Sequence, residues 1–114
     1  MPVDLPLVPQ PRMDLVAPDV TRPQAVAALL ADRVRATVLA MLADGPHCVC
    51  EMAAALGERE NNVSNHLAKL RDAGLVYSVR HAGNGRLQYY ERDAEACAAA
   101  LRSLEQVLST PRGR

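Results

Sequence analysis

The feature that most restricts the fold is a pair of short helical patterns separated by a tight turn. The first, CVCEMAAALG, ends at Gly57, and the second, ERENNVSNHLAKLRDAG, ends at Gly74. Glycine commonly ends a helix because it adopts the left-handed conformation without a side-chain clash. Two short helices around a tight turn are the arrangement of a helix-turn-helix. The sequence therefore predicts a helix-turn-helix over residues 48–74.

A β-hairpin is predicted directly after these helices. The segment LVYSVRHAGNGRLQYYER contains two β-rich runs on either side of the turn signal AGNG. Runs of this kind around a glycine-containing turn are typical of a hairpin with a loop of about four residues or slightly more. Helices, a helix-turn-helix and then a hairpin follow one another in the order of a winged helix-turn-helix. We therefore predict a mainly α fold with a β-hairpin wing.

Helical patterns flank this unit on both sides. Upstream, apolar residues recur at helical spacing from Val26 to Leu42, with Thr21 as a possible N-cap and Asp32 as a possible break into two helices. Downstream, Asp93 can cap a final helix whose apolar positions 97, 101, 104 and 108 form one stripe. A domain this small can hardly cover that stripe, so we expect a homodimer joined mainly through the last helix. Packing of the stripe on the chain's own core is the alternative.

The composition predicts one domain preceded by an extended arm. A chain of 114 residues suffices for one core but not for two. Five of its eight prolines stand among residues 1–18, and proline lacks the amide proton that helices and sheets need. We therefore expect residues 1–20 to form an extended or disordered arm and residues 21–110 to form the winged helix-turn-helix and dimerisation domain. No secretory signal pattern or run of membrane-spanning length is seen, so we expect a cytoplasmic protein without membrane contact.

The second helix of the helix-turn-helix has an outer face suited to DNA. Val63, Leu67 and Leu70 share one helical face, which should turn short polar side chains outward, namely those of Asn61, Asn62, Ser64, Asn65 and His66. Amide, hydroxyl and imidazole groups can bond base edges and phosphates when a helix enters the major groove. A merely polar, solvated face is the alternative.

Basic side chains are placed to hold phosphates beside this helix. They stand on the end of the helix and along the hairpin, at Lys69, Arg71, Arg80, His81 and Arg86. Thirteen basic and thirteen acidic side chains cancel over the whole chain. A local basic face, rather than net charge, would therefore have to hold any nucleic acid.

Cys48 and Cys50 open the first helix of the helix-turn-helix. Three cysteines cannot all pair within one chain, and a cytosolic setting keeps thiols reduced, so we expect metal or redox chemistry. A disulfide between positions i and i+2 would close a very tight ring, so we expect none. At a helix start after Pro46, the first cysteine can turn so that both sulfurs face one ion, and the helix N-terminus favours the thiolate. Simple packing of both cysteines in the core is the alternative.

Thiolate ligands select soft or borderline ions, which here means arsenite, Cd(II), Pb(II), Hg(II) or Cu(I). A trigonal sulfur site needs a third donor, and Cys97 is the best candidate by chemistry, from the same chain or from a partner subunit. Cys97 also lies on the apolar stripe of the last helix, where it could simply pack. His47 and Glu51 are nearby alternatives that would suit a zinc-type site.

On these residues the chain resembles the ArsR/SmtB family of metal-sensing winged-helix repressors. The resemblance covers roughly residues 23–108 and rests on ALLADRVRATVLAMLADG, NVSNHLAKLRDAGLV and VRHAGNGRLQYYER, while HCVCEM falls where arsenic- and cadmium/lead-type members carry a Cys-Val-Cys box. It implies a homodimer that binds operator DNA when metal-free and releases it when metal binds. It also implies that Ser64, Asn65 and His66 face DNA, with Cys48 and Cys50 in the metal box.

Two features depart from the family's pattern. Arg59 and Glu60 stand where many members begin the recognition helix with Ser-Gln, which removes a capping hydroxyl and puts an acid near DNA. The second departure concerns the third ligand, because some members have another cysteine soon after the pair, or cysteines in the N-terminal arm, and this chain has neither. Separately, the zinc-type site that other members build on the last helix would have only Asp93 and Glu95 here, without histidine, so we expect that site to be absent. The rival functions are a thiol-redox-sensing repressor of the same fold and a non-sensing DNA-binding or partner-binding module. An enzyme is not expected, because no nucleophile-and-base set or Gly-rich phosphate loop is present.

Overall fold

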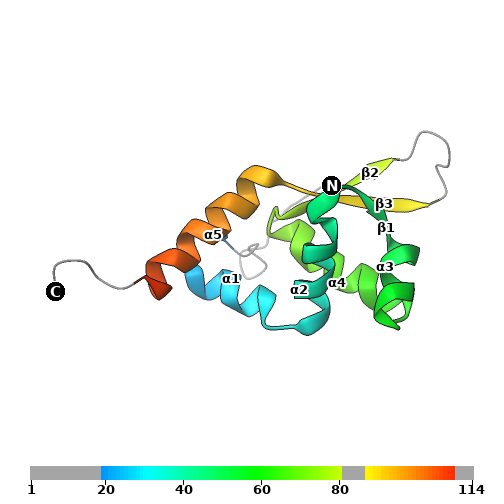
Figure 1. The fold of residues 1–114 in the computed structure, drawn as a ribbon, viewed down its shortest axis with the longest axis horizontal. Coiled ribbons are helices and arrows are strands. Elements are labelled where there is room, and N and C mark those ends of the chain that lie inside the picture. Colours follow the sequence, from blue (N-terminus) through cyan, green and yellow to red (C-terminus); the bar gives the residue numbers. More distant parts are fainter. Residues whose placement is uncertain (1–18, 81–86, 110–114) are drawn as a thin grey trace, which may run out of the picture.

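The structure, a computed structural model, describes residues 19–80 and 87–109. In these residues five α-helices and a three-stranded antiparallel sheet surround one hydrophobic core (Figure 1). The predicted fold, a mainly α winged helix-turn-helix with a hairpin wing, is confirmed. Most of the predicted arm of residues 1–20 lies outside the described residues, as do the hairpin turn and the predicted site residues His81 and Arg86.

Two consecutive helices begin the described chain. α1 (Pro23–Leu30) has its proline in the first turn, where no amide proton is needed. α2 (Arg33–Met41) begins directly after Asp32, whose carboxylate accepts hydrogen bonds from the amides of Val34 and Arg35. The predicted break at Asp32 is therefore confirmed, and its cause is a helix cap.

The entry into α1 differs from the prediction by one residue. Arg22, rather than Thr21, is the N-cap, and its side chain makes no capping bond. Thr21 instead donates its amide and its hydroxyl to the carboxylate of Asp19, which closes a turn before the helix. Val20 packs against the core, so the folded part begins before the predicted boundary at Thr21.

The two helices of the helix-turn-helix follow a short 3-10 turn, η2 (Leu42–Asp44). α3 (Val49–Leu56) ends at Gly57, whose φ of +67° is a left-handed conformation that favours glycine. α4 (Glu60–Asp72) is followed by Gly74 with φ of +83°. Both helix ends predicted from glycine are confirmed.

The sheet contains the predicted hairpin and one further strand. β2 (Val76–Arg80) pairs with β3 (Gln88–Arg92) in antiparallel register. β1 (His47–Cys48) pairs with β3 on its other side, which gives the order β1-β3-β2. We expected Cys48 to open the helix, but it lies in this strand and α3 starts at Val49. A strand of two residues is too short to show an alternating pattern in the sequence.

The core lies between the helix-turn-helix, α2 and the sheet, where Val38, Met52 and Leu67 are fully buried. α5 (Ala94–Leu108) begins after Asp93, whose carboxylate accepts the amide of Ala96, as predicted for the cap. Figure 1 shows α5 lying beside α1 at one end of the molecule, with α3 toward the opposite end. No helix in the part of the chain that the structure describes is long and apolar enough to span a bilayer.

Candidate DNA interface and thiol site

The outer face of α4 is the candidate DNA interface. The predicted apolar positions of this helix are all fully buried, namely Val63, Leu67 and Leu70. Asn61 and Asn65 are exposed one turn apart, Ser64 is partly exposed beside them, and Lys69 is exposed one turn further on. These four polar side chains, which we call the α4 stripe, lie on the side of the helix opposite its buried face. The stripe carries the donors and acceptors that base edges in a major groove can bond.

Asn62 is partly buried, although we expected it to face outward like its neighbours. Its Nδ2 donates to Oε1 of Glu58 at 2.7 Å. Glu58 Oε2 in turn lies 3.8 Å from Nη2 of Arg33 on α2. Asn62 therefore fastens the start of α4 to the preceding turn, which leaves it outside the α4 stripe.

His66 departs most clearly from the prediction. Its side chain is only 14% exposed, with Nδ1 3.1 Å from Nη1 of Arg35 and Nε2 3.7 Å from Oδ1 of Asp32. The expectation that His66 faces outward is therefore wrong. The reason is helical geometry, because position 66 follows Val63 by three residues and precedes Leu70 by four, which puts it at the edge of the buried face.

Exposed basic side chains lie at both ends of this region. Arg59 is the N-cap of α4 and makes no side-chain capping bond, which agrees with the missing hydroxyl noted in the sequence. Arg71, in the last turn of α4, is exposed and donates from Nη1 to the hydroxyl of Tyr90 on β3 at 3.4 Å. Arg80, at the end of β2, is also exposed. The sequence predicts Arg71 and Arg80 as phosphate contacts, and their exposure leaves both side chains accessible for that role.

The cysteine pair forms the N-terminal cap of α3. Cys48 is extended (φ −79°, ψ 148°) and 2% exposed, and its Sγ accepts the amide of Cys50 at 3.2 Å. The carboxylate of Glu51 accepts the amide of Cys48 at 2.8 Å, which completes a capping box. As the helix-start argument predicted, the two sulfurs turn to the same side.

The two sulfurs are joined as a disulfide, contrary to our expectation. The extended backbone of Cys48 beside the helical Cys50 brings their Cα atoms to 5.3 Å, within the range that a disulfide spans. The argument against a tight ring did not allow for a pair that straddles the boundary between strand and helix. In this oxidised state neither sulfur is a thiolate, so metal binding requires reduction first.

Two further polar side chains adjoin the pair. His47 Nε2 lies 3.1 Å from Oδ1 of Asp44, and His47 Nδ1 lies 3.7 Å from Oε1 of Glu51. The hydrogen bond from His47 holds the pKa of Asp44 below its ordinary value. His47 and Glu51 are therefore close to the helix start, as the sequence suggested for extra donors.

Cys97 lies in a different environment. It is partly buried in a groove of about 140 Å³ between α1 and α5, lined mainly by apolar side chains including Val26, Leu30 and Leu104, and its Sγ approaches the carbonyl of Leu75 at 3.8 Å. Among the residues that the structure describes, no three His, Cys, Asp or Glu side chains come together to hold a metal.

The two cysteine regions are separated along β3. Cys48 pairs with Tyr89, near the start of β3, whereas Cys97 lies one helical turn after Asp93, which follows the end of that strand. The four residue steps from Tyr89 to Asp93 span roughly 13 Å of extended chain. Cys97 was predicted as the third donor from the same chain or from a partner subunit, and in this structure Cys97 of the same chain lies apart from the pair. A bond from Cys97 of a partner subunit stays a prediction.

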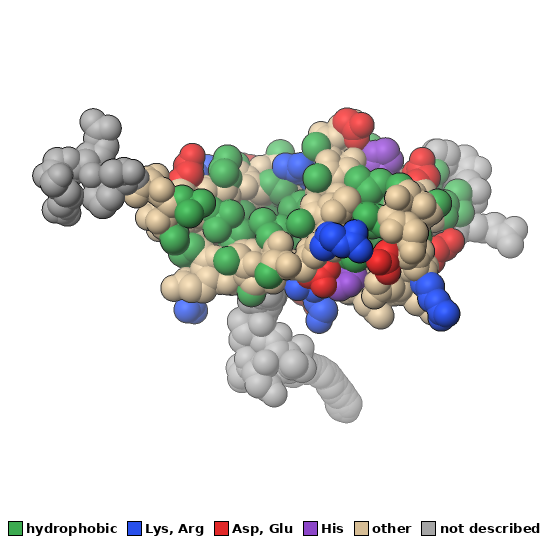
Figure 2. Space-filling model, turned by 60° about the horizontal axis from the view of Figure 1, so that its bottom comes forward, with side chains coloured by type: hydrophobic (Ala, Val, Ile, Leu, Met, Phe, Trp, Pro, Cys, Tyr) green, Lys and Arg blue, Asp and Glu red, His purple; other side chains and the backbone are tan. Residues whose placement is uncertain are grey.

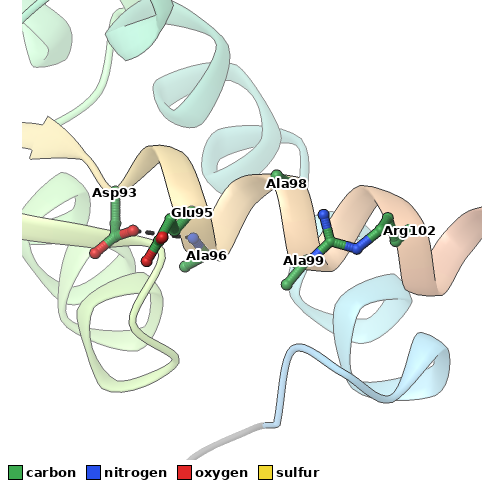
Figure 3. Close-up of a pocket in the computed structure, with 6 residues that line it drawn as sticks. All are labelled: Asp93, Glu95, Ala96, Ala98, Ala99 and Arg102. Carbon is green, nitrogen blue, oxygen red and sulfur yellow. Dashed lines mark hydrogen bonds between the residues drawn. The ribbon is translucent and has the colours of Figure 1, made fainter.

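A hollow of about 540 Å³ lies at the start of α5. Figure 3 shows the side chains that line it. The hollow is lined by Asp93, Glu95, Ala96, Ala98, Ala99 and Arg102. The carboxylate of Asp93 is turned back to cap the helix, and Arg102 adds a cationic group to the same hollow. A cap that is already bonded and a neighbouring guanidinium both disfavour a divalent cation here.

An apolar surface lies at the α1 and α5 end of the molecule, where Figure 2 shows hydrophobic side chains gathered. On α5, Leu101 is 60% exposed, Val107 62% and Leu108 78%. Of the predicted stripe, Leu101 and Leu108 are therefore uncovered, whereas Cys97 and Leu104 are partly buried and pack against the chain's own core. The same helix buries Ala100 and Ser103. An uncovered surface of this kind is typical of an interface.

Comparison with known proteins agrees with this architecture. The profile of the family described as "Bacterial regulatory protein, arsR family" matches residues 32–78, which run from the cap of α2 into β2. Over 78 residues the chain is 36% identical to the arsenic resistance transcriptional regulator ArsR1 of Pseudomonas putida, which covers 68% of this chain and 59% of that protein. Over 79 residues it is 40% identical to the HTH-type transcriptional regulator CmtR of Mycobacterium bovis, covering 69% and 64%.

The matched part thus spans less than two thirds of the length of these relatives. A solved structure, of a possible transcriptional regulator for arsenical resistance, superposes with a TM-score of 0.67 at 25% identity. That match covers 75% of this chain and 85% of the other. Sequence and fold comparisons therefore point to the same class of proteins.

Proposed function

Because the chain belongs to the ArsR family, a family of transcriptional regulators and not of enzymes, we propose that it represses transcription by binding operator DNA as a homodimer. The proposed inducer is arsenite or a soft metal ion such as Cd(II), Pb(II) or Hg(II), bound by the reduced thiols of Cys48 and Cys50. The arsenic resistance regulator of Pseudomonas putida, to which the chain is similar, supports an inducer of this class.

In this proposal the α4 stripe enters the major groove. Asn61, Ser64 and Asn65 contact base edges, while Arg71 and Arg80 contact phosphates. Asn61, Asn65 and both arginines are exposed and Ser64 is partly exposed, which supports the assignment. Arg86, which lies outside the described residues, stays a predicted phosphate contact.

A homodimer is supported by the uncovered apolar side chains of α5. Leu101 and Leu108 are large and exposed, and a second copy that covers them would remove apolar area from water. Two copies related by a two-fold axis would present two α4 helices to two half-sites of one operator.

One observation carries the sensing proposal: the two sulfurs converge at the cap of the helix that packs on α4. Met52 and Ala53 of α3 share the buried core with Leu67 of α4. A ligand that draws Cys48 and Cys50 onto one atom must change the cap of α3. Such a change would reach α4 through this shared core, and a coupling of about 1–3 kcal/mol would lower DNA affinity roughly 5- to 150-fold.

The chemistry can be written in balanced steps. A dithiol reductant returns the disulfide to two thiols and is itself oxidised to a disulfide. Arsenous acid, As(OH)₃, then exchanges two hydroxyls for the two sulfurs and releases two waters. Cys97 of a partner subunit could supply a third sulfur to arsenic, whereas His47 or Glu51 would suit a borderline divalent ion better.

A second function is favoured by the disulfide itself. In a thiol-redox-sensing repressor, a peroxide would oxidise the two thiols to the Cys48–Cys50 disulfide and be reduced to water. The bond that forms replaces two S–H groups at the cap of α3. The same coupling to α4 would then lower DNA affinity when the thiols are oxidised, rather than when a metal binds.

A titration on DNA separates the two functions. Operator DNA is first selected from random sequences by the reduced wild-type protein, and arsenite, Cd(II), Pb(II), Hg(II) and Zn(II) are then added separately without peroxide. We expect release by arsenite or a soft ion, and DNA binding without release in the Cys48→Ser/Cys50→Ser double variant. Release by peroxide alone would favour the redox function. Full release of the double variant by metal would overturn the assignment of this pair.

A further inference from the structure

Arg35 on α2 joins three parts of the molecule. Its Nε donates to the carbonyl of Leu29 at 2.7 Å and its Nη2 to the carbonyl of Ala28 at 3.3 Å. These carbonyls belong to the last turn of α1, where a helix leaves carbonyl groups without partners and a cation is favoured. The remaining guanidinium nitrogen, Nη1, lies 3.1 Å from Nδ1 of His66 on α4.

The guanidinium determines which nitrogen of His66 carries the proton. Arginine has only donors, so Nδ1 must accept and is unprotonated. The proton of a neutral ring is then on Nε2, which faces Oδ1 of Asp32 at 3.7 Å. Asp32 is already held by the amides at the start of α2, so both groups that face His66 are themselves fixed.

These contacts leave His66 poorly placed to touch DNA. The side chain is 14% exposed, and both of its nitrogens face α2. Asn65, the next residue, is exposed in the α4 stripe. Two adjacent residues of α4 therefore face different surroundings: the side chain of Asn65 faces solvent and that of His66 faces α2.

We propose that His66 is a positioning residue that orients α4 against the junction of α1 and α2 through Arg35, and does not read bases. The inference rests on the proposed DNA-binding function and specifies how α4 is held for it. Since α1 lies beside α5 at the proposed dimer interface, this bridge also links that interface to the recognition helix. It would thereby help to set the orientation of the two α4 helices in a dimer.

The closing experiment first tests the bridge without DNA. Long-range ¹H–¹⁵N NMR of the full-length wild-type protein reports which ring nitrogen of His66 is protonated. We expect Nδ1 to be unprotonated and to shift when Arg35 is replaced in Arg35→Ala. A protonated Nδ1 in the neutral ring would overturn the bridge, whatever the protein does with DNA.

A second experiment measures binding of the variants to the selected operator DNA and to versions of it with single base pairs changed. We expect His66→Ala to weaken binding about tenfold on all of them, with an unchanged salt slope, because no base or phosphate contact is lost. The matched control Asn65→Ala should instead relax discrimination at one base pair. His66→Asn should restore most of the affinity, because Asn Oδ1 can occupy the place of Nδ1 and accept from Arg35.

A double-variant cycle completes the test. His66→Ala combined with Arg35→Ala should bind no more weakly than Arg35→Ala alone, because the first change removes a contact that the second has already removed. Additive effects, or relaxed discrimination at one base pair in His66→Ala, would overturn the proposal. Failure of the wild-type protein to bind any DNA would instead contradict the proposed function and leave the NMR result standing.

Discussion

The two ends of this molecule hold their cysteines in opposite ways. At the start of α3, Cys48 and Cys50 belong to a helix cap, in which the sulfur of Cys48 accepts the amide of Cys50 and the carboxylate of Glu51 accepts the amide of Cys48. In the groove between α1 and α5, Cys97 is surrounded mainly by apolar side chains, and its sulfur approaches one backbone carbonyl. After reduction, a sulfur at a helix N-terminus is in a setting that favours reaction, whereas the apolar groove shields the sulfur of Cys97 from solvent. The difference shows that the setting of a cysteine, and not its presence, decides its chemistry.

The same two ends also differ in what they leave uncovered. The helix-turn-helix end exposes the short polar side chains of the α4 stripe, defined above by Asn61, Ser64, Asn65 and Lys69. The α1 and α5 end exposes large apolar side chains, of which Leu108 is the most exposed. A polar stripe suits base edges and an apolar surface suits another protein surface. The proposed partners, operator DNA and a second copy of the chain, follow this division.

The largest expected effect tests the apolar end. Leu101→Glu places a charge in the proposed dimer interface, where it would be buried without a partner. We expect the dimer dissociation constant to rise by about a hundredfold or more, measured by sedimentation equilibrium. Leu87→Glu is the matched control, because Leu87 is also an exposed leucine, 37% accessible, but lies next to the hairpin strand β3. Equal dimerisation of both variants and wild type would refute the assignment of α5.

A smaller effect is expected at the polar end. Asn65→Ala should cost about 1–3 kcal/mol of discrimination at one base pair, because an amide that bonds a base edge is lost. Arg80→Ala should weaken binding to all sequences alike and lower the salt slope by roughly one unit, because a phosphate contact is lost. Filter binding at several salt concentrations measures both. If both variants changed base-pair discrimination and salt slope in the same way, the α4 stripe would not read bases.

The contrast between the cysteines can be sharpened by alkylation. After reduction at neutral pH, we expect iodoacetamide to label Cys50 about tenfold faster than Cys97, because the helix N-terminus favours the thiolate and the groove shields the other sulfur. Mass spectrometry of timed samples gives the two rates. If Cys97 reacted first, the apolar groove would not protect its thiol, and the comparison between the two ends would fail.

Much of the architecture could be predicted because single residues with specific backbone roles mark its boundaries. Gly57 and Gly74 follow the helices of the helix-turn-helix, and Asp32 and Asp93 cap α2 and α5. Each of these residues marks a helix end through its own backbone conformation or through bonds to amides a few residues away. Such local effects can be predicted from the sequence alone. β1 was missed because its pairing with β3 is a contact between distant segments, and two residues carry no detectable period.

The candidate site was predicted less completely, for reasons that lie in packing. A helical face was divided into inner and outer positions, but His66 lies at the edge between them, and its partner Arg35 is 31 positions away in the sequence. One signal was present: residue 66 stands between Val63 and Leu70 at spacings of three and four. The disulfide was missed because the pair was placed wholly within a helix, whereas Cys48 belongs to a strand.

The smallest expected effect concerns acid stability at the junction of α1 and α2, which lies between the two ends. Asp32 has a pKa below its ordinary value of 3.8, chiefly because the backbone amide of Arg35 donates to its carboxylate, with a smaller contribution from the amide of Val34. A carboxyl with a lower pKa in the folded state stabilises the fold above its unfolded pKa. That contribution is lost as the pH falls through the folded pKa.

Asp32→Asn isolates this effect, because asparagine keeps a side-chain oxygen that can cap α2 but carries no charge. We expect the free energy of unfolding of the variant, measured by urea denaturation, to fall less steeply than that of wild type below about pH 4. Between pH 5 and 7 the two proteins should differ by a nearly constant amount, because the carboxylate is then ionised in both the folded and the unfolded wild type. If the free energies of unfolding of the two proteins fell in parallel below pH 4, the charge of Asp32 would contribute nothing to stability. The side-chain oxygen of residue 32 alone would then cap α2, at the junction between the interface helix α1 and the helices that position α4.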